Sequence, residues 1–321
     1  MMLFGRIKIS FLRTTVAVLL LTTLLFACKD DKVAYLTFKT PESGARIATG
    51  TSFTASLEFN GIPDSVVYFV DSTRVGAKAD TSGFTINTAG YPLGNHVLLA
   101  KVYSQGKFED VTSNIIILAA KAPKEYSFNL INTYPHDKEA YTQGLEFHNG
   151  YLYESTGQEG RSSLRKVELT TGKVLQRANL ENATEFGEGI TIVGNKIVYL
   201  TWKSGVGHVY DKATFKKTGD FTYPGREGWG LAFDGQRLLN TDGSESIYFM
   251  NKDTYQTTGS VEVYDNNGAV DSLNEIEFIN GKVYANVYLS DGFYANKILI
   301  INPATGAVEA TINLTGLNPE K

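Results

Sequence analysis

One carboxylate in this chain has the setting of a group that could move protons. Glu188 lies between Gly187 and Gly189, directly before the β-branched run at residues 190–192. Glycine on both sides indicates a tightly packed backbone, which is an unusual place for an ordinary surface charge. A carboxyl group held there could take a proton from one atom of a substrate and return it to another.

The position of Glu188 recurs along the chain at intervals of about 40 to 45 residues. Each occurrence opens a short apolar strand, and we call these four positions the anchors. The anchors are Gln143, Glu188, Trp229 and Asn274. Two amides, an acid and an indole are the components of a polar pocket with an aromatic wall. The alternative is that the anchors are ordinary strand starts and that Glu188 is solvated.

The elements that would position the anchors follow one plan in each repeat. The anchor strand ends in a tight turn, such as Asn149-Gly150 or Asn280-Gly281, and three further strands follow. Four strands in about 40 to 45 residues is the period of a β-propeller blade. Because the first strand of each blade lines the central axis, the anchors should converge at one end of the channel. Glycine follows three of the anchors, which allows close packing at the crowded centre.

The predicted fold is therefore all-β, with a five-bladed β-propeller whose last blade is incomplete in this chain. The repeats account for four blades, and residues 127–134 are predicted to form the outer strand of a fifth. An open ring would expose two sheet edges, which proteins normally cover. We therefore expect the propeller to be C-terminally truncated here, with about 30 further residues, or three short strands and their turns, encoded after position 321.

Composition and charge exclude several classes of protein. The chain has 321 residues, a net charge of −4 and a pI of about 5.7, and no basic stripe that would suit nucleic acid. One cysteine excludes a disulfide framework, and four scattered histidines have no metal-ligand spacing. We expect a globular protein without a metal site, a cofactor or a nucleic-acid partner, and we expect a monomer.

The N-terminus has the pattern of a bacterial lipoprotein signal. Arg6, Lys8 and Arg13 precede an apolar run at residues 16–26, and Cys28 follows at the position where such signals are cleaved and acylated. We interpret residues 1–27 as the signal peptide and 28–32 as the acylated cysteine and its tether. The protein should then be exported and lipid-anchored in the bacterial cell envelope, at the outer membrane, and the pattern leaves open the periplasmic or the surface side.

Two further regions follow the tether. Residues 33–120 contain about seven short alternating strands, which predicts an immunoglobulin-like β-sandwich without its disulfide. It carries no chemistry-bearing motif, so we expect it to hold the next domain away from the membrane. Residues 121–125 are interpreted as a polar linker, and 126–321 as the propeller.

Seven motifs in the propeller region resemble those of a known family. They are Tyr141-Thr142-Gln143-Gly144-Leu145, Tyr153-Glu154-Ser155-Thr156-Gly157, Phe186-Gly187-Glu188-Gly189, Leu200-Thr201-Trp202, Glu227-Gly228-Trp229-Gly230-Leu231, Leu273-Asn274-Glu275-Ile276-Glu277 and Ala285-Asn286-Val287-Tyr288. In this order and spacing they resemble the plant-type, non-zinc glutaminyl-peptide cyclotransferases, which are five-bladed propellers. The family's Thr-Gly-Lys motif has no counterpart before Lys321.

The resemblance implies an activity and assigns roles. The implied reaction converts the N-terminal glutamine of peptides and proteins to pyroglutamate with release of ammonia, without metal or cofactor. Glu188 would be the catalytic proton shuttle. The implied substrate-binding residues are Gln143, Asn274, Trp202, Trp229, Phe186, Tyr141 and Tyr288.

Two other functions fit parts of the same pattern. A non-catalytic propeller could bind peptide N-termini or another ligand through the same aromatic pocket. A metal-dependent lactonase-type propeller would need several carboxylate and amide ligands around the axis, and the anchors supply only one acid.

Overall fold

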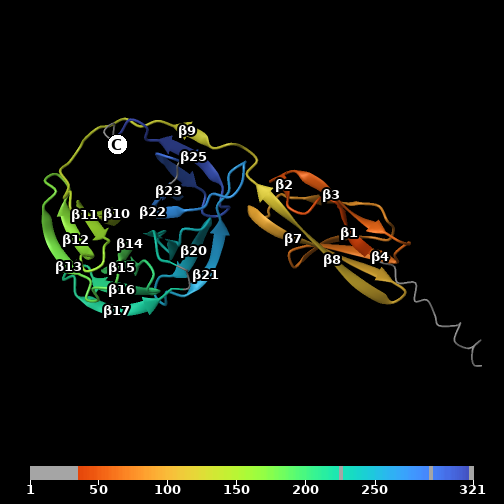
Figure 1. The fold of residues 1–321 in the computed structure, drawn as a ribbon, viewed down its shortest axis with the longest axis horizontal. Helices are drawn as coiled ribbons and strands as arrows, with labels where there is room; N and C mark the ends of the chain where they lie inside the picture. Colours follow the sequence, from red (N-terminus) through yellow and green to blue (C-terminus); the bar gives the residue numbers. More distant parts are fainter. Residues whose placement is uncertain (1–34, 224–226, 289–291, 318–321) are drawn as a thin grey trace, which may run out of the picture.

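The structure is a computed structural model that describes residues 35–223, 227–288 and 292–317 (Figure 1). The predicted signal peptide, Cys28 and the tether lie outside the described residues, as does Lys321. The described residues form β-strands without an α-helix, which confirms the predicted all-β class. Within these three ranges there is consequently no helix with the length and apolar character needed to span a bilayer.

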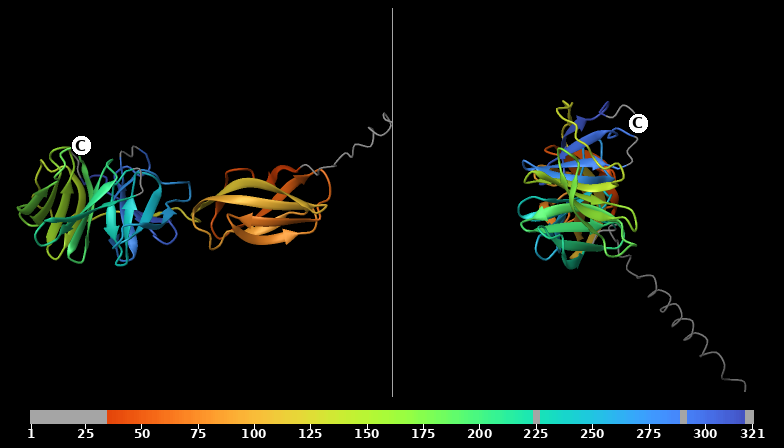
Figure 2. Two further views of the ribbon diagram at one scale, coloured as in Figure 1. Left: turned by 90° about the horizontal axis from the view of Figure 1, so that it is seen from below. Right: turned by 90° about the vertical axis from the view of Figure 1, so that its left-hand side faces the viewer.

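Residues 35–118 form two sheets packed face to face (Figures 1 and 2). The strand orders are β1-β3-β6 and β2-β8-β7-β4-β5. Alternate residues of β4, such as Val66 and Tyr68, are fully buried against Ala55 and Leu57 of the opposite sheet, as a half-buried strand requires. The strands are β1 (Tyr35–Thr40), β2 (Ala45–Ala48), β3 (Ser52–Phe59), β4 (Ser65–Val70), β5 (Thr73–Lys78), β6 (Phe84–Asn87), β7 (Gly94–Ser104) and β8 (Lys107–Leu118). The immunoglobulin-like assignment of this sandwich stays a prediction.

Four further sheets stand around a common axis like the blades of a propeller (Figure 1). In each, the strand that carries an anchor or directly follows one is innermost, and the next three strands follow outward. The first two sheets are β10 (Thr142–His148), β11 (Tyr151–Thr156), β12 (Ser163–Glu168), β13 (Val174–Asn179) and β14 (Gly187–Val193), β15 (Lys196–Thr201), β16 (Val206–Asp211), β17 (Lys217–Thr222). The other two are β18 (Leu231–Phe233), β19 (Arg237–Thr241), β20 (Ser246–Asn251), β21 (Thr257–Glu262) and β22 (Leu273–Ile279), β23 (Lys282–Val287), β24 (Lys297–Ile301), β25 (Val308–Asn313), with β9 (Lys124–Tyr126) added outside β25.

The inner strands approach one another more closely than side chains allow. A Cβ atom on Gly144 would lie 2.7 Å from the backbone nitrogen of Ile190, and one on Gly189 would lie 2.6 Å from that of Leu231. A Cβ atom on Gly230 would lie 2.2 Å from the carbonyl oxygen of Asn274 in β22. The glycines that follow three anchors are therefore required by the packing at the axis, as the sequence predicts.

The outer strand predicted at residues 127–134 is wrong for the described structure. This segment forms no strand, and Leu130 and Ile131 are 63% and 85% exposed. Strand hydrogen bonds need a neighbouring backbone, and no described strand pairs with this segment. The parallel partner of β25 is instead β9, whose residues fall across the predicted linker and the start of the predicted propeller domain. Figure 1 shows the chain continuing from β9 along the outside of the ring to β10. The fifth blade stays a prediction.

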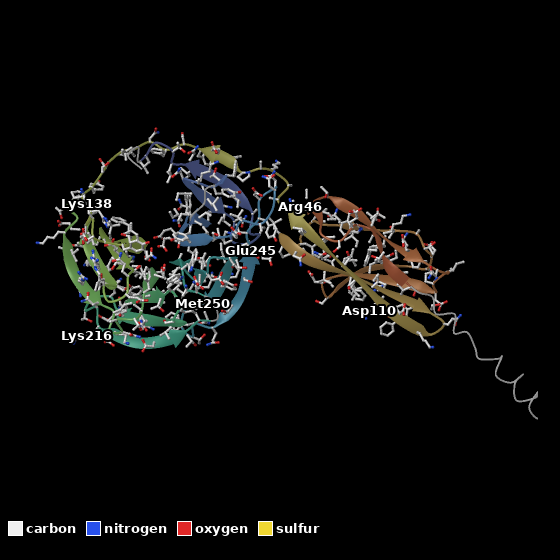
Figure 3. All side chains as sticks on the ribbon, in the orientation of Figure 1. Arg46, Asp110, Lys138, Lys216, Glu245 and Met250 are labelled. Carbon is white, nitrogen blue, oxygen red and sulfur yellow. The ribbon has the colours of Figure 1, made fainter. Side chains whose placement is uncertain are left out.

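The sandwich packs directly on the propeller. Ile117 and Leu118 at the end of β8 belong to one buried apolar cluster with Tyr264, which follows β21. The backbone nitrogen of Ala119 donates a hydrogen bond to the Asp265 carbonyl at 3.1 Å. Arg46, labelled at this junction in Figure 3, extends the contact through its guanidinium, which donates to the Asn267 carbonyl at 2.8 Å.

The axial packing predicts the effect of one added methyl group. Gly189→Ala should lower the free energy of unfolding by about 1–3 kcal/mol, because the new Cβ would collide with the backbone of the third blade. Gly219→Ala in β17 is the matched control, since a Cβ there has nothing within 4 Å. Urea unfolding of both variants measures the difference. Equal stability of the two variants would contradict the packing argument.

Candidate active site

Eight side chains line one pocket at the end of the channel where the inner strands begin. Its volume is about 190 Å³, which is below the range of about 300–1,000 Å³ typical of drug-sized sites. The lining residues are Tyr141, Gln143, Phe186, Glu188, Trp202, Trp229, Asn274 and Tyr288. These are the eight candidate residues named from the sequence, and the structure brings all of them together. Their individual roles stay predictions.

The anchors occupy a recurrent irregularity of the backbone. Gln143, Glu188 and Asn274 are each the second residue of their inner strand, and each lies at a shift in strand register. A bulge bends the strand and re-aims its side chains, which explains how residues in regular strands turn toward the end of the channel. Trp229 differs, because it lies two residues before β18 begins.

Hydrogen bonds between blades hold the anchor backbones in place. The Ser155 hydroxyl donates to the carbonyl of Glu188, and the Thr241 hydroxyl donates to the carbonyl of Asn274 at 2.6 Å. In both cases a second strand of one blade binds the anchor of the next blade along the chain. These bonds satisfy the backbone carbonyls of two anchors and tie neighbouring blades together.

Glu188 is a buried acid with an altered proton affinity. Its exposure is 5%, and its Oε1 accepts a hydrogen bond from Gln143 Nε2 at 2.9 Å. Burial raises the pKa of Glu188 from 4.5 to about 8; the Gln143 hydrogen bond opposes this rise and the charge of Glu227 adds to it. A carboxyl group with this pKa exchanges protons near neutral pH.

Aromatic rings form the wall of the pocket in two groups. Phe186 contacts Tyr141 edge-on at a centroid distance of 6.1 Å and Trp202 at 5.6 Å. On the other side, Trp229 contacts Tyr288 edge-on at 5.6 Å. Such contacts stabilise the rings and limit their rotation. The wall presents π faces that could hold a cationic amine.

Residues 99–321 match the family model described as glutamine cyclotransferase. The chain belongs to this family. The match covers the propeller and the last strands of the sandwich, and the family assignment agrees with the resemblance seen in the sequence motifs.

Two relatives support the assignment. A glutaminyl-peptide cyclotransferase of Arabidopsis thaliana is 40% identical over 190 residues, which are 59% of this chain and 58% of the plant protein. The chain thus spans less than two thirds of that relative's length. The crystal structure of the Myxococcus xanthus glutaminyl cyclase is 33% identical, with a TM-score of 0.56 over 61% of this chain and 80% of the other. This likeness supports the β-propeller fold.

The sequence reasoning left several partly buried acids without a role. Glu146 on β10 accepts hydrogen bonds from Thr191 Oγ1 at 2.9 Å and from the Ile192 nitrogen at 2.8 Å, so it joins two inner strands. On β22, burial raises the pKa of Glu275 well above its usual range and that of Glu277 to about 8. Glu146 and Glu277 both lie three residues after an anchor, and this shared repeat position was the signal in the sequence. In the part of the chain that is described, no three His, Cys, Asp or Glu side chains are arranged to hold a metal ion.

Glu227 is a further acid to which the sequence analysis assigned no role. Its carboxylate lies between the two indoles of the pocket wall. It belongs to a motif that marked the family, but it is not an anchor and does not line the pocket. Its position at the wall therefore emerges only from the folded structure.

The raised pKa of Glu188 predicts a pH-dependent gain in stability on its removal. The unfolded chain ionises this group near 4.5, whereas the folded protein keeps it protonated up to about pH 8. Glu188 therefore costs stability increasingly as pH rises through this window. Glu188→Gln should be near neutral at pH 4 and should raise the free energy of unfolding by up to about 5 kcal/mol at pH 9. Urea unfolding at both pH values tests this, and an identical effect at the two would contradict it.

Proposed function

We propose that this protein is a glutaminyl-peptide cyclotransferase in which Glu188 moves the proton. The observation that carries the proposal is a buried carboxylate with a pKa of about 8, set among amides and aromatic rings in a small pocket of a chain from this family. The substrate class is peptides and proteins with glutamine at the N-terminus. In the reaction, the α-nitrogen bonds to the side-chain carbonyl carbon, the bond from that carbon to the amide nitrogen breaks, and ammonia leaves.

The proton transfer is matched to the substrate. The α-amino group of a peptide has a pKa of about 7.7–8.0, close to that of Glu188. Near pH 8 both the free amine that attacks and the Glu188 carboxylate that accepts its proton are therefore present in substantial fractions. Glu188 as the carboxylate accepts the proton that the attacking amine loses, and then as the acid gives it to the departing nitrogen.

The amide side chains suit the two remaining tasks, orientation and charge stabilisation. Asn274 and Gln143 carry amide N–H groups that can donate to the carbonyl oxygen of the substrate side chain and to its backbone. Donors held in place before the reaction stabilise the negative charge that develops on this oxygen. Gln143 already donates to Glu188, so it also orients the proton shuttle.

The aromatic wall supplies shape and exclusion of water. Phe186, Trp202 and Trp229 would enclose the curled conformer in which amine and carbonyl meet, with Tyr141 and Tyr288 at the more exposed rim. Nucleophile and electrophile belong to one residue, so the proposed mechanism routes no step through a metal or cofactor. The net charge of −4 argues against a nucleic-acid partner.

Glu188→Gln tests the enzymatic proposal. The variant should lose about 10²- to 10⁴-fold in kcat, because the amide cannot accept the proton, and should still bind a Gln-initiated peptide. Ammonia release and the corresponding loss of mass from the peptide measure turnover. Glu58→Gln, at an exposed position in β3, is the matched control. Unchanged turnover in Glu188→Gln would contradict the shuttle, and peptide binding by the unaltered chain without ammonia release would favour the non-catalytic alternative.

We also propose that the chain is exported and anchored through Cys28 to the bacterial envelope, with the sandwich as a spacer. The support is the basic and apolar N-terminal pattern that ends at this single cysteine. Cys28→Ala should move the protein from the membrane fraction to the soluble fraction of an expressing bacterium. A variant that remains in the membrane fraction would contradict the anchor.

A further inference from the structure

The two halves of the aromatic wall meet at one carboxylate. Glu227 Oε2 accepts a hydrogen bond from Trp202 Nε1 at 2.5 Å and a second from Trp229 Nε1 at 2.8 Å. No direct ring contact between these two indoles is recorded in the described structure, whereas each contacts a ring of its own group. Glu227 thus joins the Phe186 side of the wall to the Tyr288 side.

The local backbone holds Glu227 in this place. The nitrogen of Gly228 donates to the Trp202 carbonyl at 2.8 Å, and a Cβ on Gly228 would lie 2.7 Å from the Thr201 carbonyl oxygen. Only glycine at position 228 therefore lets this segment come so close to the end of β15. The side chain of Glu227 is 25% exposed, and its other oxygen lies 3.8 Å from Lys203 Nζ. One carboxylate oxygen of Glu227 thus accepts the hydrogen bonds of both indoles, and the other faces the ammonium group of Lys203.

We propose that Glu227 is a positioning residue that sets the angle between the two indoles around the substrate glutamine. The indole N–H is a donor with no acceptor capacity, so each ring can satisfy this group only where an acceptor stands. A shared charged acceptor gives short, strong hydrogen bonds and fixes both rings relative to one another. The kinetic consequences of this inference rest on the proposed function, but the hydrogen bonds do not.

The same carboxylate has an electrostatic effect on the proton shuttle. Its charge helps to raise the pKa of Glu188. Besides burial, the charge of Glu188 in turn raises the pKa of Tyr199, Tyr223 and Glu275, and Lys203 Nζ lies 3.8 Å from Glu227 Oε1. Positioning and charge can be separated by substitution, because glutamine keeps a carbonyl acceptor for the indoles and removes the charge.

The chain offers a direct readout, because Trp202 and Trp229 are its only two tryptophans. Both indole N–H resonances and all tryptophan emission therefore report on this wall. In Glu227→Ala, both resonances should move toward the position of a free indole and emission should shift to the red. In Glu227→Gln, both resonances should stay close to those of the unaltered chain. Glu227→Asp keeps the charge but retracts the acceptor by one methylene, so its resonances should move as in the alanine variant.

Kinetics on a Gln-initiated peptide complete the test. The alanine and aspartate variants should lose about 10- to 100-fold in kcat/KM, because the reacting groups are displaced. The glutamine variant should keep KM within about twofold, and the acid limb of its kcat/KM profile should move to lower pH. Glu58→Gln is again the control. Unchanged indole resonances in folded Glu227→Ala or Glu227→Asp would overturn the positioning role. Displaced resonances without ammonia release by the unaltered chain would support that role and contradict the proposed function.

Discussion

The close approach of the inner strands at the axis is the constraint on which the rest of the propeller depends. Gly144, Gly189 and Gly230 bring each inner strand against the backbone of the next, at distances that exclude a Cβ atom. This packing leaves no room for side chains at these positions, and a register shift accompanies three of the anchors. The anchor side chains consequently turn toward the channel end. The pocket is a product of the way the blades pack at the centre.

Burial at the axis then gives Glu188 its chemistry. Water is largely excluded from the carboxyl group, so its charged form is disfavoured and its pKa approaches that of a peptide amine. The same burial makes the ionised form a cost to the folded state above neutral pH. The structure tolerates this cost at a position where proton exchange is useful, which is the usual relation between stability and activity at an active site.

Much of this arrangement could be predicted from the sequence because it repeats. The anchors, the glycines and the hairpin turns recur at a fixed period, and the structure brings Gln143, Glu188, Trp229 and Asn274 into one pocket as expected. Features that do not repeat were either not predicted or predicted wrongly. Residues 127–134 were predicted to be a strand but pair with no described strand. β9, which includes residues interpreted as a linker, pairs with β25 instead. The contact of Glu227 with both indoles could not be predicted, because only folding brings Trp202 and Trp229 to the same carboxylate.

The central claim is that one buried carboxyl group carries the proton, and its titration tests that claim most directly. The side-chain carboxyl carbon of Glu188 can be followed by NMR across the pH range in ¹³C-labelled protein and assigned by its absence from Glu188→Gln. The account predicts a midpoint of about 8, well above 4.5. A midpoint near 4.5 would show that Glu188 is a solvated surface acid, and it would contradict the role proposed for it.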